Sequence, residues 1–111
     1  MNQGYLTTHV LDVMRGTGAG GMMVSVRHIA PAGRVWPAIA LDAGGRATLI
    51  EPGHLIAGLY EILFDAGSYQ VAQQPGFFTD IPVRFKVDDG TMHVHVPLIL
   101  SAFGYTVYRG G

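Results

Sequence analysis

The chain has 111 residues, of which 49% are hydrophobic and 14% are charged, with a formal net charge of −1. This size and apolar content predict a single domain over residues 1–111 and exclude a disordered chain. The near-neutral charge excludes a surface built to bind nucleic acid or an anionic membrane, and the lack of cysteine excludes disulfides and thiolate chemistry.

Targeting signals are also missing from the sequence. The N-terminus has no basic segment followed by an apolar run, and no stretch is apolar for long enough to span a membrane. We therefore expect a cytoplasmic protein without a signal peptide. Sixteen glycines and few charges leave little polar surface for a monomer, which favours an oligomer.

The first half of the chain contains four stretches typical of β-strands, at residues 5–13, 22–29, 35–41 and 47–50. Pro37 makes the third of these an edge strand or a broken one. The loop over residues 15–21 holds four glycines, but no Gly-Lys-Ser/Thr follows it, so nucleotide binding is not expected.

The second half begins with a strand at residues 58–65, followed by a short helix over residues 68–74 with Ser68 as its N-cap. A strand within residues 77–87 then leads to Asp88-Asp89-Gly90, a sequence typical of a hairpin turn. Two more strands close the chain. Seven or eight short strands with at most one helix predict an antiparallel β-sandwich.

The strongest candidate for a site is the histidine pair near the C-terminus. His93 and His95 alternate with apolar residues, so on a strand they project from one face, about 6.6–7 Å apart. Three hypotheses follow: zinc bound by this pair with His9, metal-free acid–base chemistry by histidines with Arg46, or ligand binding without catalysis. Two other histidines, His28 and His54, adjoin turn-forming residues and are predicted to lie on the surface.

Three segments together resemble a known family. Leu6-Thr7-Thr8-His9-Val10-Leu11-Asp12, the stretch from His93 to Ser101, and the closing Gly104-Tyr105-Thr106-Val107-Tyr108-Arg109-Gly110 are similar to the transthyretin-related 5-hydroxyisourate hydrolases. The resemblance covers nearly the whole chain. It implies a transthyretin-like sandwich of two four-stranded sheets with one short helix, assembled as a homotetramer, a dimer of dimers with active sites at the interface.

The resemblance also implies a reaction and its residues. The family hydrolyses 5-hydroxyisourate in urate breakdown, a step of purine metabolism, without metal or cofactor. The matching catalytic positions are His9, Arg46 and His95, and His93 becomes a supporting residue. The histidines would orient and deprotonate water while Arg46 polarises the substrate carbonyl, and which histidine is the base stays open. The chain end would line the site with Tyr108, Arg109, Gly110 and Gly111.

The sequence departs from the family pattern at several positions. The family ends Tyr-Arg-Gly-Ser, whereas this chain ends in Gly111, and its Asp-Gly-Arg is Gly44-Gly45-Arg46 here. The first loop has Gly18 where proline is usual, and Ala102 replaces the proline after Ser101. These changes leave open a slower enzyme, a paralogue that hydrolyses another cyclic ureide or amide, or a transthyretin-like binding protein without activity.

Overall fold

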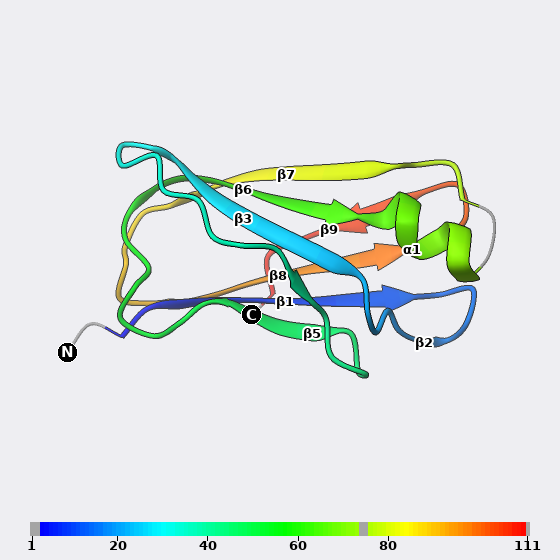
Figure 1. The fold of residues 1–111 in the computed structure, drawn as a ribbon. Coiled ribbons are helices and arrows are strands. Elements are labelled where there is room, and N and C mark those ends of the chain that lie inside the picture. Colours follow the sequence, from blue (N-terminus) through cyan, green and yellow to red (C-terminus); the bar gives the residue numbers. More distant parts are fainter. Residues whose placement is uncertain (1–2, 74–75, 111) are drawn as a thin grey trace.

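Two β-sheets pack face to face, and a short helix lies at one end of the sandwich (Figure 1). The computed structural model describes residues 3–73 and 76–110. The first sheet contains β1 (Tyr5–Asp12), β2 (Thr17–Gly18), β5 (Arg46–Ile50), β8 (His93–Leu100) and β9 (Tyr105–Val107). The second sheet contains β3 (Met23–Ala30), β4 (Ile39–Ala40), β6 (Gly58–Asp65) and β7 (Asp80–Val87). The helix α1 (Ala66–Gln73) follows β6 directly.

The pairing of the strands confirms the predicted all-β sandwich, with two differences. The second sheet has the order β4-β3-β6-β7 and is antiparallel throughout. In the first sheet, the central strands β1 and β8 run parallel. Because β8 occupies one edge of β1, the short strands β2 and β5 share the other edge. In the described part of the chain this sheet therefore has five strands rather than the predicted four.

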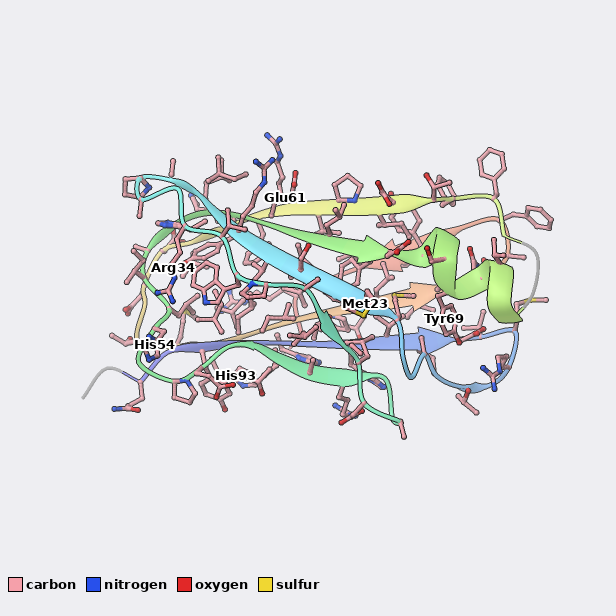
Figure 2. The ribbon with its side chains drawn as sticks, in the orientation of Figure 1. Met23, Arg34, His54, Glu61, Tyr69 and His93 are labelled. Carbon is pink, nitrogen blue, oxygen red and sulfur yellow. The ribbon has the colours of Figure 1, made fainter. Side chains whose placement is uncertain are left out.

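Side chains alternate between the two faces of each long strand, and this alternation builds the core. In β1, Leu6 and Val10 are fully buried, and in β8, Val94, Val96 and Leu98 are buried as well. They belong to one cluster of apolar side chains between the sheets. The odd-numbered residues of β1 and β8 consequently face away from the core. In Figure 2, the His93 side chain lies on the opposite side of the molecule from Glu61 of the second sheet.

The helix starts earlier than predicted. It begins at Ala66, and the N-H of Ser68 donates to Oδ1 of Asp65 at 3.1 Å, so Asp65 rather than Ser68 caps the helix. The predicted last helical residue, Gln74, lies outside the described residues. Over the ranges described above, no helix is long and apolar enough to cross a membrane.

Two predicted strand features also differ. The stretch Asp88–Gly90 is not a hairpin turn, because β7 and β8 belong to different sheets and the chain crosses between them there. The strand expected around Pro37 is reduced to β4 and an isolated bridge between Val35 and Arg27. Proline has no N-H to donate to a neighbouring strand, which accounts for the interruption.

The prediction that His28 lies on the surface is wrong. His28 is 1% exposed, because it continues the inward-facing alternation of Val24 and Val26 along β3. Its ring packs against Tyr60 with centroids 4.5 Å apart, and its Nε2 has no hydrogen-bond partner among the described residues. His54 is exposed, as predicted.

Candidate functional site

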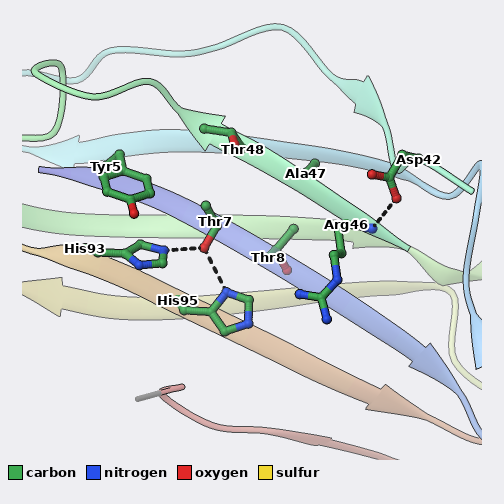
Figure 3. A pocket seen from close by; sticks show the side chains of 9 residues that line it. All are labelled: Tyr5, Thr7, Thr8, Asp42, Arg46, Ala47, Thr48, His93 and His95. Carbon is green, nitrogen blue, oxygen red and sulfur yellow. Dashed lines mark hydrogen bonds between the residues drawn. The ribbon is translucent and has the colours of Figure 1, made fainter. Parts of the chain in front are cut away.

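A pocket of about 540 Å³ opens on the outer face of the first sheet (Figure 3). This volume lies within the range of small-molecule sites. The lining residues come from β1, β5, β8 and the turn before β5: Tyr5, Thr7, Thr8, Asp42, Arg46, Ala47, Thr48, His93 and His95. Most of these side chains are polar, so the pocket suits a small polar ligand.

The central strand β1 brings the predicted site residues together. Its parallel pairing with β8 places Thr7 opposite His95, and its antiparallel pairing with β5 places His9 opposite Arg46. Since Thr7 and His9 are two residues apart, both project to the same outer face. Residues from three distant parts of the sequence thus meet on one surface.

A tight turn before β5 positions Arg46. Oδ1 of Asp42 accepts hydrogen bonds from the N-H groups of Gly44 and Arg46, both at 2.9 Å. Gly45 adopts a φ of +78°, and a Cβ there would lie 2.5 Å from the carbonyl oxygen of Val10. This position therefore requires glycine. The resulting turn fixes where β5 begins.

The same turn holds His9. Its Nε2 lies 3.1 Å from the carbonyl oxygen of Gly44. Because a carbonyl only accepts, Nε2 carries the proton, and the neutral ring keeps its lone pair at Nδ1. His9 is half-buried and stands beside the pocket lining rather than within it.

The two histidines of β8 share one hydroxyl group. Oγ1 of Thr7 lies 2.6 Å from Nε2 of His93 and 2.8 Å from Nδ1 of His95. The His93 ring also stacks on Tyr5, with centroids 4.0 Å apart and an interplanar angle of 5°. Both rings are therefore held at defined positions.

Burial lowers the pKa of His95 from its ordinary value near 6.5, and electrostatic interaction with His93, Arg46 and His9 lowers this pKa further. A hydrogen bond with the Thr7 backbone acts in the opposite direction and raises this pKa. The net lowering keeps the imidazole neutral at pH 7, where it accepts a proton. A neutral base beside a guanidinium is a pair suited to water attack on a carbonyl group.

The C-terminal residues predicted to contact substrate lie in different surroundings. The N-H of Gly110 donates to the carbonyl of His95 at 2.7 Å, and a Cβ on Gly110 would lie 2.5 Å from Cδ2 of that ring. Tyr108 is half exposed, and its N-H donates to the carbonyl of Pro97. Nη2 of Arg109 instead lies 3.9 Å from Sδ of Met92, beside a separate cavity of about 90 Å³. Gly111 lies outside the described residues.

Sequence reasoning missed six of the nine residues that line the pocket: Tyr5, Thr7, Thr8, Asp42, Ala47 and Thr48. Thr7 was detectable, since it alternates with His9 on β1 and so shares its face. Asp42 precedes two glycines and an arginine, a composition typical of a side-chain-stabilised turn. The stacking of Tyr5 on His93 follows only from the parallel register of β1 and β8.

The zinc hypothesis required His9, His93 and His95 to converge on one point. Within residues 3–73 and 76–110, no group of three or more His, Asp or Glu side chains could hold a metal ion. The two β8 histidines instead bond to the Thr7 hydroxyl, as described above.

Comparison with known proteins shows that this chain is similar to 5-hydroxyisourate hydrolases. The curated 5-hydroxyisourate hydrolase of Mesorhizobium japonicum (strain LMG 29417 / CECT 9101 / MAFF 303099) is 37% identical to this chain over 115 residues, covering 96% of this chain and 92% of that protein. The solved structure of 5-hydroxyisourate hydrolase from Klebsiella pneumoniae has a TM-score of 0.83 and 30% identity, over 96% of this chain and 99% of that one.

A third match is the crystal structure of (S)-allantoin synthase, with a TM-score of 0.89 and 31% identity. It covers 98% of this chain but 44% of the synthase, so this chain corresponds to less than half of that protein. Residues 6–110 match the model of the HIUase/Transthyretin family, which includes every strand described above except the first residue of β1. This chain belongs to the HIUase/Transthyretin family.

Proposed function

We propose that this chain is a hydrolase that opens the ring of 5-hydroxyisourate. Two similar proteins carry that name, and both align along almost their whole length. The observation that carries the proposal is the meeting of His95, with its lowered pKa, and the Arg46 guanidinium at one pocket. The matched segments include all three predicted catalytic residues.

In the proposed reaction, Nε2 of His95 takes a proton from water as the water oxygen adds to a ring carbonyl of the substrate. Arg46 stabilises the negative charge that develops on the carbonyl oxygen. The ring C–N bond then breaks, and the His95 imidazolium returns its proton to the departing nitrogen. His9 keeps a lone pair at Nδ1 that orients the water or a substrate N-H.

The chain end completes the proposed site. Gly110 packs against the His95 ring, so the backbone there forms one wall beside the base. Tyr108 and Gly111 stay predicted substrate contacts. Arg109 contacts Met92 in this structure, and a substrate contact by its side chain would require leaving that position.

We also propose that the chain is a single domain assembled as a homotetramer, with its sites where two dimers meet. The support is the family resemblance together with the position of the pocket on an open sheet face (Figure 3). A cytoplasmic location stays a prediction from the sequence.

Two other functions are alternatives to the hydrolysis of 5-hydroxyisourate. A paralogue that hydrolyses a different cyclic ureide or amide would use the same base and guanidinium. A binding protein without activity would need neither a lowered His95 pKa nor Arg46 beside it, and the presence of both favours a hydrolase.

The decay of freshly generated 5-hydroxyisourate, followed by ultraviolet absorbance, tests the proposal. The wild type should accelerate the decay, and His95→Asn and Arg46→Gln should lower kcat/KM by about 10²–10⁴-fold. His54→Asn is the matched control, because His54 is exposed and away from the pocket. A chelator should have no effect. Decay no faster than in buffer would contradict the proposed substrate and point to another cyclic amide.

A further inference from the structure

The hydroxyl of Thr7 bridges the two histidines of β8, and Figure 3 shows it between their rings. A threonine hydroxyl has one proton and two lone pairs. It therefore donates to at most one of the two ring nitrogens, whereas its oxygen can accept an N-H from either ring. The proton positions on His93, Thr7 and His95 are thus linked.

His95 can act as a base at Nε2 only when its ring donates from Nδ1 to the Thr7 hydroxyl. The neutral His95 ring must carry its proton at Nδ1 and donate it to Oγ1 of Thr7. This leaves the Thr7 proton free to go to Nε2 of His93 when the proton of that ring sits at Nδ1. In the reverse arrangement, Thr7 donates to Nδ1 of His95, and Nε2 of His95 carries a proton and cannot accept another.

Two surrounding groups favour the first arrangement. Arg46 lines the same pocket, and in Figure 3 the second ring nitrogen of His95 lies on the side of the ring toward this guanidinium. A guanidinium is positively charged and only donates, so it favours a lone pair over an N-H on that side. Stacking on Tyr5 fixes the plane of the His93 ring with Nε2 toward Thr7.

We propose that Thr7 is a positioning residue that keeps the His95 proton at Nδ1 and so presents Nε2 as the base, with His93 accepting the Thr7 proton. The inference rests on the proposed function for its effect on turnover. Its effect on proton location is independent of any substrate. Neither Thr7 nor His93 needs to touch the reacting atoms for this role.

Two substitutions of Thr7 form the first test. Thr7→Val keeps the branched shape and removes the hydroxyl, whereas Thr7→Ser keeps the hydroxyl. Long-range ¹⁵N–¹H correlation spectra, recorded at about pH 8 so that histidines are neutral, report which nitrogen of His95 is protonated. We expect the Nδ1-H form in the wild type and in Thr7→Ser, and a shift toward the Nε2-H form in Thr7→Val.

Turnover should follow the spectra. We expect kcat of Thr7→Val to fall about 10- to 100-fold, the usual cost of losing a group that orients a functional histidine, with KM nearly unchanged. Thr7→Ser should recover most of the loss. A merely structural role would change stability in Thr7→Val but would not move the His95 proton.

Two substitutions of His93 form the second test. His93→Gln places an amide oxygen near the former Nε2 and can still accept from Thr7, whereas His93→Phe keeps a ring on Tyr5 without an acceptor. We expect His93→Phe to reproduce the spectral change of Thr7→Val and His93→Gln to avoid it. The double variant Thr7→Val/His93→Phe should be no slower than Thr7→Val alone.

An Nε2-H form of His95 in the wild type, or an unchanged Nδ1-H form in Thr7→Val, would overturn the inference. The spectra need no substrate, so they test the positioning role of Thr7 separately from the proposed function. A chain inactive on 5-hydroxyisourate whose His95 loses the Nδ1-H form in Thr7→Val would refute that substrate and still support the positioning role.

Discussion

At the scale of single residues, Gly110 controls the position of His95, the proposed base. A Cβ at this position would lie 2.5 Å from Cδ2 of His95, a distance that carbon atoms without a bond do not tolerate. We expect Gly110→Ala to push the ring away from the pocket and to lower kcat/KM about 100-fold, since small displacements of catalytic groups are costly. Gly104→Ala is the control, because its Cβ would meet only Oγ of Ser101 at 3.7 Å. Equal activity of the two variants would contradict the assigned packing.

The protonation of His95 gives a second residue-scale prediction. Burial lowers the pKa of His95 first, and nearby positive charge, including Arg46, lowers it further. As the pH falls through this pKa the imidazole gains a proton and stops acting as a base, so a lowered pKa extends activity toward acid. NMR titration of the wild type should place the His95 midpoint below 6.5.

Arg46→Gln should move that midpoint upward, because the imidazolium then escapes repulsion by the guanidinium. Arg84→Gln should leave it in place, because Arg84 pairs with Glu61 on the second sheet. A midpoint that rises equally in both variants would show that the shift comes from overall charge rather than from the pocket.

The Asp42–Arg46 turn matters at the scale of structural elements, because it supports both Arg46 and His9. Gly45 in this turn has a φ of +78° and packs against the backbone of β1. Gly16 has a similar φ of +70°, but a Cβ there meets nothing within 4 Å. We expect Gly16→Ala to cost about 1 kcal/mol from backbone strain alone and Gly45→Ala to cost at least about 1 kcal/mol more.

Urea denaturation measures the two free energies of unfolding, and the hydrolysis assay measures the consequence for the site. Gly45→Ala should also lose activity at temperatures where it is folded, since the turn no longer holds Arg46 in place. If both variants have the same stability and full activity, the turn does not position the site.

The proposed assembly belongs to the scale of the whole molecule. Light scattering of the purified protein should give a mass about four times the 11.9 kDa of one chain. If the sites lie where two dimers meet, the activity per chain should fall on dilution as the assembly dissociates. A mass of one chain at full activity would instead show that the pocket in Figure 3 works alone.

The sequence predicted those features that depend on residues close together in the chain. Alternation within a single strand correctly predicted that His93 and His95 project from one face, opposite the buried Val94, Val96 and Leu98, and the strand at residues 58–65 has the predicted bounds. The same rule, applied to His28, would have predicted its burial. The terminal motifs led to the family, which the comparisons show.

Only the tertiary structure decided which strands lie side by side. The parallel pairing of β1 with β8 joins residues more than eighty positions apart, and it places the Thr7 hydroxyl between His93 and His95. The crossing at Asp88–Gly90, where a hairpin was predicted, has the same origin. Alternation is a property of one strand and is written in its local pattern, whereas the choice of a neighbouring strand depends on packing across the whole core.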